Sequence, residues 1–489
     1  MMSCNSRLLF LAMLPVAVLS LILANGAYAL TLQEAHNEAL KANLGIKSTH
    51  EKTVQADELS YESYTKLFPV VSLLGQTSYA SEEDGVIIGQ GAWGVFPFGP
   101  IPAQDSRVVS EENNIAYTGA IRVQQPIFTG GRIWFNYKSM QSQHDEARLN
   151  EEQFVQEILL NTEKAYFTLL KAQERLLIAE AHRAAVAEQL SDMEKRFKYG
   201  RSNLNDLLKS RVQLADADSE LLKAKNGVLV AEGQMNLLLN RPLEQPVKAV
   251  PVGDPPQVTL SSAAAKELAK LANKALNSAR QKRLTAEFQR RIAEADYYPS
   301  ISFTGQYNAQ GGMANYRDTW WFAGISMEWN IWQWGGTKSK VSAAKAYERQ
   351  VEYDVSSLEN KTVIEVRDAY LLISEADQRV IADRESVKQA EENLRITKIG
   401  YQSGRNTATE LLKAEDLLVQ AKGMLVQDRY EAHVSRSQLR FIMSKMESLD
   451  FLTHRTLTPA TEEKPAVPAV PEPQDRAAVP EPLYAEAAE

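Results

Sequence analysis

Few residues of this 489-residue chain have the types and spacing of a catalytic or metal-binding site. Its six histidines are scattered and its single cysteine is Cys4, so neither a zinc site nor a nucleophile–histidine triad is supported. The segment GQGAWG (89–94) matches the dinucleotide fingerprint G-x-G-x-x-G, but that fingerprint needs a following helix, which the prolines up to residue 102 prevent. We therefore predict an external loop at 80–115, with no catalytic residue, metal or cofactor.

The most specific spacing surrounds two glycine turns. KYGRSNLNDLLKS occupies 198–210, and QSGRNTATELLKA repeats its pattern at 402–414. Each segment places Gly-Arg, then an acidic residue and Leu-Leu, between two helical patterns. Glycine suits the left-handed backbone that ends a helix, and Ser202 or Asn203 and Thr407 are candidate caps for the helices that restart. The sequence thus predicts two similar helical hairpins.

These turns belong to a longer internal repeat. KAYFTLLKAQERL (164–176) aligns with DAYLLISEADQRV (368–380), and FPVVSLLGQTSY (68–79) matches YPSISFTGQYNA (298–309). We predict two copies, 30–240 and 263–446, of helix, strand, loop, strand, very long helix, turn and shorter helix. In the first copy the elements are predicted at 32–66, 68–79, 116–128, 132–198 and 204–240. In the second copy they are predicted at 263–298, 299–309, 319–332, 337–403 and 405–444.

The segments outside the two copies differ from them in composition. Residues 1–29 hold a short apolar run followed by Ala27-Tyr28-Ala29, which predicts a signal peptide cleaved after Ala29 rather than a membrane anchor. A Pro-rich linker at 241–262 joins the copies. Residues 447–489 are rich in proline, alanine and glutamate and predict a disordered periplasmic tail, either inert or in contact with the cell wall.

The predicted helices are too long for a globular domain. A 67-residue helix would be about 100 Å long, whereas helices in globular proteins average about 11 residues. In the shorter helix Leu207, Leu214 and Leu221 recur every seven positions beside Ala217 and Ala224. That period is typical of left-handed coiled coils, and helix length disfavours the alternative of a globular bundle core.

The predicted strands alternate between apolar and polar residues. In WFAGISMEWNIW (321–332) the odd positions are apolar, and five of the seven tryptophans lie between 320 and 334. This is typical of a membrane strand with aromatic girdles, although a soluble sheet packed on helices would alternate too. The predicted girdle residues are Trp320, Trp321, Trp332 and Trp334. Four strands cannot close a barrel, and lipid does not tolerate an open edge, so several identical chains would have to close it.

The chain has a formal net charge of -8 with basic and acidic residues interspersed, which argues against nucleic acid as its main partner. The signal, the two copies and the repeated glycine turn together resemble the TolC family of outer-membrane efflux and secretion channels, over roughly residues 30–446. The resemblance implies a mainly α fold in which a helical coiled-coil barrel continues into a transmembrane β-barrel, with four strands per chain and twelve per homotrimer.

The same resemblance implies outer-membrane localisation with a large periplasmic part. It also implies a passive exit duct without catalysis that works with a periplasmic adaptor (membrane fusion protein) and an inner-membrane pump. The runner-up is a non-membrane helical scaffold or adaptor protein of the envelope, and an enzyme is a more distant third.

The resemblance also assigns roles at the turns. Adaptor docking would fall on Gly200, Arg201, Ser202, Gly404, Arg405 and Asn406, unless these residues only form the turns. Similar channels close their entrance through an aromatic residue and an acid, here Tyr401 and Asp206. Two positions depart from the family: Asn406 replaces an arginine that completes this link, and Lys413 replaces an acid. We expect three Glu410 side chains to form an anionic ring at the narrowest point, unless Lys413 pairs with them.

Overall fold

The computed structural model describes residues 29–79, 86–87, 108–109, 115–200, 202–311 and 319–449. Most of the predicted signal peptide, most of the predicted 80–115 loop, Arg201 and nearly all of the predicted tail lie outside these residues. No helix in the described ranges is both long enough and apolar enough to span a membrane.

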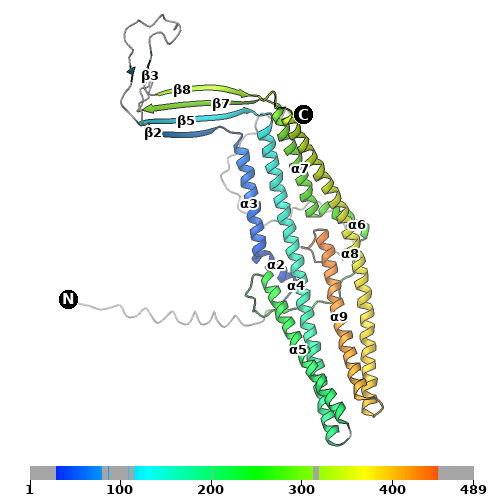
Figure 1. Cartoon of the computed structure of the whole chain (residues 1–489). Coiled ribbons are helices and arrows are strands. Elements are labelled where there is room, and N and C mark those ends of the chain that lie inside the picture. The colour runs from blue at the N-terminus through cyan, green and yellow to red at the C-terminus, as the bar shows by residue number, and fades with distance from the viewer. Residues whose placement is uncertain are drawn as a thin grey trace, which may run out of the picture.

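Two 67-residue helices run the length of the helical body, α4 (Arg132–Lys198) and α8 (Gly336–Gln402) (Figure 1). Each folds back into a 35-residue helix, α5 (Leu204–Leu238) after α4 and α9 (Ala408–Ile442) after α8. The remaining length of α4 is covered by α2 (Leu32–Ala42) and α3 (Leu44–Thr65), and that of α8 by α6 (Ser262–Ala272) and α7 (Lys274–Glu294). At about 1.5 Å per residue, each long helix is about 100 Å long.

Two helices predicted to be continuous, 32–66 and 263–298, are each broken by an asparagine. The side-chain oxygen of Asn43 accepts hydrogen bonds from the backbone N–H of Gly45 (2.9 Å) and Ile46 (3.3 Å), and Asn273 caps α7 in the same way. The Asn43 amide also donates to Leu238 O (3.1 Å), and the Asn273 amide donates to Ile442 O (2.8 Å). Each asparagine therefore starts one helix and holds the end of another, which a continuous helix could not do.

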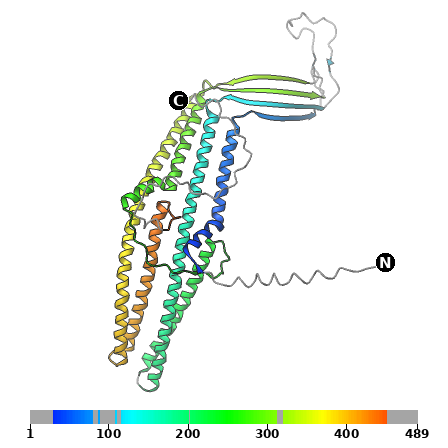
Figure 2. The ribbon, with the colours of Figure 1, turned by 180° about the vertical axis from the view of Figure 1, so that it is seen from behind.

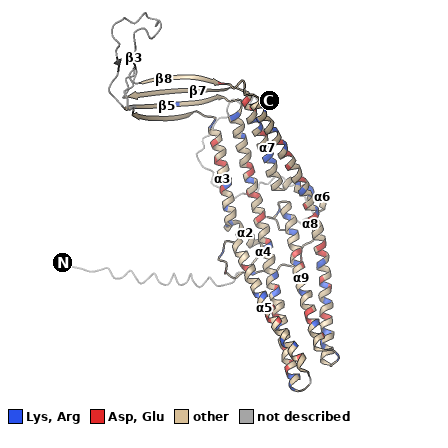
Figure 3. Cartoon of the chain, in the orientation of Figure 1, with Lys and Arg blue, Asp and Glu red and all other residues tan. Residues whose placement is uncertain are grey.

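One antiparallel sheet extends from the end of the helical body opposite to the two hairpin turns (Figure 1). Its strands lie in the order β2-β5-β7-β8, and they span Val70–Tyr79, Ile115–Phe128, Ser300–Gly311 and Thr319–Glu328. The short pairs are β1 (Ala29–Leu30) with β6 (Lys248–Ala249), and β3 (Val86–Ile87) with β4 (Val108–Val109); a 3-10 turn, η1, covers Ala295–Tyr297. Figure 3 shows that charged residues concentrate on the helices and are nearly absent from the sheet.

The strand register separates an apolar face from a polar face. Ile121 of β5 pairs with Leu73 and Tyr307, and Tyr307 pairs with Trp321. In the neighbouring row Arg122 pairs with Gln306 and donates from Nε to its side-chain oxygen at 2.7 Å. Since successive strand residues point to opposite faces, the apolar row and the Arg122 row lie on different sides.

Strand β8 ends at Glu328, four residues before the predicted end at 332. The chain leaves the sheet at Trp329, whose indole N–H donates to Tyr297 O (3.2 Å). Trp334 then adopts a positive φ of 51° beside Gly335 at 81°, immediately before α8. The last residues of the predicted strand therefore form a connection into α8. The Trp329 contact and the turn at Trp334 and Gly335 take the place of hydrogen bonds between β8 and β7.

The main core lies midway along the helical body, where α2, α4, α5, α9 and the inter-repeat linker meet. Tyr166, Leu169, Met235, Leu239 and Tyr430 are almost completely buried there. The Tyr166 hydroxyl lies 3.0 Å from Leu30 O and 2.8 Å from Val250 O, so it joins the start of the first copy and the inter-repeat linker to α4. We call this band of core and linker the equator; Figure 2 shows it from behind.

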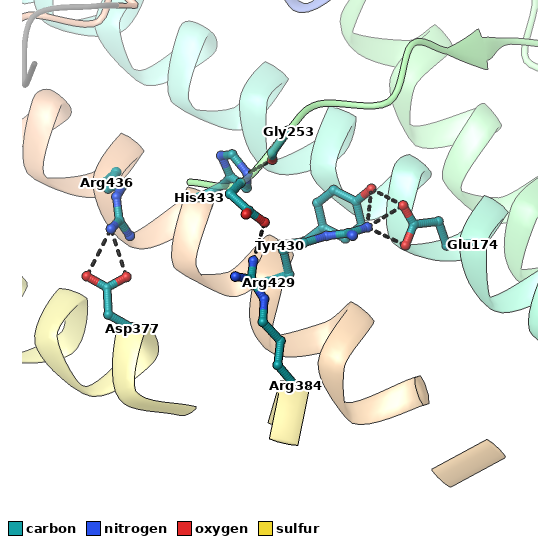
Figure 4. Close-up of polar contacts among 9 residues, drawn as sticks. Glu174, Gly253, Asp377, Arg384, Arg429, Tyr430, His433 and Arg436 are labelled. Carbon is teal, nitrogen blue, oxygen red and sulfur yellow. Dashed lines mark hydrogen bonds and ion pairs between the residues drawn. The ribbon is translucent and has the colours of Figure 1, made fainter. Parts of the chain in front are cut away.

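The linker is fastened to α9 by polar contacts, shown in Figure 4. His433 Nε2 lies 3.0 Å from Gly253 O, and Arg436 donates to Asp377 of α8 (2.8 Å). Arg436 also donates to Pro256 O of the linker. One turn earlier, the Tyr430 hydroxyl donates to Glu174 of α4 at 2.6 Å. These contacts tie the linker, α4 and α8 to one short helix.

Candidate functional site at the hairpin ends

A glycine in left-handed backbone ends each long helix. Gly200 follows α4 with φ 69°, and Gly404 follows α8 with φ 72°. The Gly200 N–H donates to Phe197 O (2.9 Å) and the Gly404 N–H to Tyr401 O (3.1 Å). Glycine adopts this conformation without the steric cost that a Cβ atom brings. The structure thus places a hairpin turn at both repeated segments, at the end far from the sheet (Figure 1).

Different residues restart the two short helices. Asn203, rather than Ser202, caps α5, because its side-chain oxygen accepts from Asp206 N–H at 2.8 Å. The Ser202 hydroxyl instead donates to Met193 Sδ at 3.0 Å. Thr407 and Glu410 form a reciprocal capping box at the start of α9, in which Glu410 Oε2 accepts from Thr407 N–H at 2.8 Å. The pattern T-x-x-E is the sequence signature of this box, but the prediction from sequence named only Thr407 as a cap.

The two polar residues after Gly404 differ in exposure. Arg405 is exposed, and its Nε donates to the Ser403 hydroxyl at 3.1 Å. Asn406 packs inside the turn against Gly400, where a Cβ added to this glycine would lie only 2.7 Å from Asn406 Cγ. Asn406 therefore fills the turn, while Arg405 is accessible to a partner.

Tyr401, at the end of α8, meets the first hairpin through Arg196, an arginine that was not among the predicted site residues. The Arg196 guanidinium carbon lies 4.8 Å from the centre of the Tyr401 ring, within the range of a cation–π contact. Burial raises the pKa of Tyr401, while Arg196 lowers it and Asp192 and Asp206 raise it. Tyr401 and Asp206 are thus close enough to interact electrostatically. No local motif indicates the Arg196 contact, since it joins two different hairpins.

Near this contact, few hydrogen bonds join the two hairpins. Gln213 donates to Asp416 (2.9 Å), Lys209 Nζ lies 3.5 Å from the Thr409 hydroxyl, and Gln189 donates to Glu415. Between α5 and α9 lies a cavity of about 440 Å³, lined by residues that include Leu208, Val212, Leu412 and Lys413. No ion pair joins Lys413 to Glu410, two residues that the structure describes. Apolar packing between the hairpin ends is therefore incomplete.

A buried carboxyl group lies further along the contact between the two hairpins. Glu415 of α9 is 8% exposed, and its Oε2 has no hydrogen-bond partner among the described residues. Burial raises the pKa of Glu415 to about 7, the nearby Lys398 lowers it, and Asp416 and Glu188 raise it further. This carboxyl group therefore holds its proton to a higher pH than an exposed glutamate does.

The four predicted girdle tryptophans do not share one face. Trp321 lies on the apolar face and is largely exposed, whereas Trp320 lies on the polar face and stacks on Phe322 with ring centres 5.7 Å apart. Trp332 and Trp334 lie in the connection after β8, with ring centres 5.8 Å apart. Trp320 and Trp321 are separated because neighbouring residues of a strand point to opposite sides.

In the described part of the chain, no three or more His, Cys, Asp or Glu side chains lie so that together they could hold a metal ion.

Comparison with known proteins agrees with this architecture. The family model for outer membrane efflux proteins matches residues 36–241 and 266–444. The chain is 24% identical to outer membrane protein TolC of Vibrio cholerae serotype O1 over 335 residues, covering 65% of this chain and 75% of that protein.

Solved channels show the same fold. The Campylobacter jejuni outer membrane channel CmeC has a TM-score of 0.72 and 16% identity, covering 85% of both chains. CusC has a TM-score of 0.71 and 18% identity, covering 84% of this chain and 91% of its own. The chain therefore belongs to the outer membrane efflux protein family, and it is an outer-membrane channel for efflux or secretion rather than an enzyme.

Proposed function

We propose that three copies of this chain form one passive duct, each supplying a third of its wall. The observation that carries this proposal is the four-stranded sheet, which has an exposed apolar face and two edges, β2 and β8, without a strand partner in the described chain. An open edge is not stable in lipid. Pairing β8 of one copy with β2 of the next would give a closed barrel of twelve strands, four from each of three chains.

The helical body supports the same assembly. Both α5 and α8 carry large apolar side chains that are at least half exposed in the single chain, among them Leu222, Leu229, Leu237, Ile364, Leu371 and Ile381. Leu222 and Leu229, like Ile364 and Leu371, are seven residues apart, the spacing of a coiled-coil seam. A neighbouring copy that packs on these stripes would remove them from water.

The assembly is tested with the full-length protein extracted from outer membranes in detergent. Chemical cross-linking should end at a trimer, and the trimer should form discrete conducting channels in planar bilayers. A folded monomer that stays in solution without detergent would contradict the proposal.

We propose that the hairpin ends dock the periplasmic adaptor of a tripartite system that includes an inner-membrane pump. The exposed Arg405 and the turn at Gly404 support this role, and Arg201, Gly200, Ser202 and Asn406 are assigned to it by position. Arg405→Ala should reduce adaptor co-purification and leave the trimer intact. Arg384→Ala, which removes a surface contact to Asp254 at the equator, is the matched control. Equal losses in both variants would contradict docking at the tip.

We also keep the anionic ring of Glu410 as a proposal. One carboxylate oxygen caps α9, and the side chain is exposed, so the charge remains available in the mouth of the duct. Glu410→Gln removes the charge but keeps the capping box, because glutamine can also occupy that position. Cation selectivity and divalent block in planar bilayers should fall. If both are unchanged, the selective ring lies elsewhere.

Cleavage after Ala29 remains part of the proposal for the N-terminus. Leu30 would become the first residue, and it is buried, with its carbonyl accepting from Val250 N–H at 2.9 Å. The new end would thus be held in the equatorial core. N-terminal sequencing of the mature protein tests this boundary.

A further inference from the structure

We propose that Arg196 is a positioning residue that holds the two hairpins of each chain together and keeps the channel entrance closed, by stacking on the Tyr401 ring. This inference rests on the proposed function as a trimeric duct. It concerns a contact inside one chain, between the end of α4 and the end of α8.

The geometry of the contact suits an arginine. The guanidinium carbon of Arg196 lies 4.8 Å from the Tyr401 ring centre. Arg196 Nε donates to Asp192 Oδ2 one turn earlier on α4, at 2.8 Å. That bond holds the planar guanidinium over the ring. A lysine ammonium is a compact charge and cannot stack on the ring in the same way. Asp192, Arg196 and Tyr401 therefore form a clasp between the hairpins.

The Tyr401 hydroxyl does not take part in the contact between the hairpins. It forms no hydrogen bond to any residue that the structure describes, and Asp206 acts on it only through its charge. Asn406, which stands where similar channels have an arginine, packs inside its own turn on Gly400. The cation that faces Tyr401 is thus supplied by the first hairpin, and the aromatic ring is the part of Tyr401 that matters.

The clasp matters because few other contacts join the hairpin ends. Among the residues that the structure describes near the turns, the polar contacts between the hairpins include Lys209 with Thr409 and Gln213 with Asp416, and a cavity of about 440 Å³ lies between α5 and α9. The Arg196–Tyr401 pair is one of the few side-chain contacts that join the two ends beside this cavity. Its loss should let them separate without unfolding the helices.

The test uses the purified full-length protein in planar bilayers. Arg196→Gln and Tyr401→Leu should each raise the open-to-closed ratio about fivefold per chain, the factor expected for one such contact. The double variant should open no further than either single variant. Tyr401→Phe, which keeps the ring, should behave like the wild type, and Arg196→Lys should lie between wild type and Arg196→Gln.

A matched control is Arg211→Gln, which breaks the ion pair with Glu194 (3.2 Å) inside the first hairpin and should not change conductance. If the wild type forms no channel, the proposed function fails. If it forms one and Arg196→Gln conducts like the wild type, the clasp is wrong. If Tyr401→Phe opens the channel as much as Tyr401→Leu, the hydroxyl makes the joint and the clasp is equally wrong.

Discussion

The equator and the hairpin ends use the same helices in opposite ways. At the equator α4 and α9 are joined by a dense apolar core, by linker contacts and by buried charges. At the ends the two hairpins meet through a few polar side chains beside a cavity. Regions with few buried contacts open at lower free energy than densely packed ones. We therefore expect the helices to stay together in the middle and to separate more easily at the tip.

Buried charge makes the contrast sharper. Glu163 of α4 is completely buried; its Oε2 accepts from Arg440 at 2.5 Å and from Ser437, and its Oε1 lies 3.1 Å from His36 Nε2. Burial alone would raise the pKa of Glu163, but the contacts with His36, Arg440 and Ser437 outweigh it and lower the pKa. The network joins α2, α4 and α9. Removing one charged member leaves the remaining buried charge without its partner.

The largest expected effect comes from Glu163→Ala. It leaves Arg440 buried and without its carboxylate, which should destabilise the fold by about 3–5 kcal/mol. Thermal unfolding of the detergent-solubilised protein measures this. Glu194→Ala, which removes an exposed partner of Arg211 near the tip, should change stability by less than about 1 kcal/mol. Equal losses at both sites would remove the contrast between equator and tip.

The next effect is a pH dependence at the seam between the hairpins. Below the ordinary pKa of 4.5, Glu415 is protonated whether or not the hairpins are packed. Between 4.5 and about 7 only the packed state keeps the proton. Packing should therefore weaken as pH rises through this window, by up to roughly 3 kcal/mol, and the loss is complete above pH 7.

The measurement is the rate of protease cleavage near the turns at pH 5 and pH 8. Glu415→Gln should reduce the difference between the two rates, because glutamine does not titrate. The variant leaves Asp416, Glu188 and Lys398 in place, and Gln189 keeps a polar partner. An undiminished pH dependence in this variant would assign the titration to another group.

Tyr166→Phe should cost about 1–2 kcal/mol at the equator, because it removes the hydroxyl that lies between Leu30 O and Val250 O. Hydrogen exchange should report earlier opening of residues 248–250, which pair with the segment at Leu30. Tyr347→Phe, at a half-exposed position on α8, is the control and should have little effect. Unchanged exchange in Tyr166→Phe would show that the apolar core alone holds these strands.

The smallest expected effect is that of Gly404→Ala. A Cβ at φ 72° should cost about 1 kcal/mol and loosen only the second turn. Gly423→Ala, within α9 and with no atom near the added Cβ, should be neutral or stabilising. Protease cleavage at 402–408 compares the two variants. A Gly404→Ala variant as resistant as the wild type would show that the turn tolerates this strain.

The sequence alone determined the long helices, the two turns and the alternation of the strands. The prediction of a helix at 132–198 matches α4, the prediction at 337–403 differs from α8 by one residue at each end, and both turn glycines were identified. The alternation of residues in the strands also predicted the two faces of the sheet. These features depend on backbone bonds and side-chain periods within a few residues, which the order of residues shows directly.

Only the tertiary structure decided where elements break and which distant side chains meet. Asn43 breaks a helix because its amide bonds to a carbonyl 195 residues away, and Trp329 leaves β8 to bond to Tyr297. The pairs Arg196 with Tyr401 and Glu163 with Arg440 likewise join different hairpins or copies. Their energies depend on which helix faces lie against each other, and local periodicity does not specify that choice.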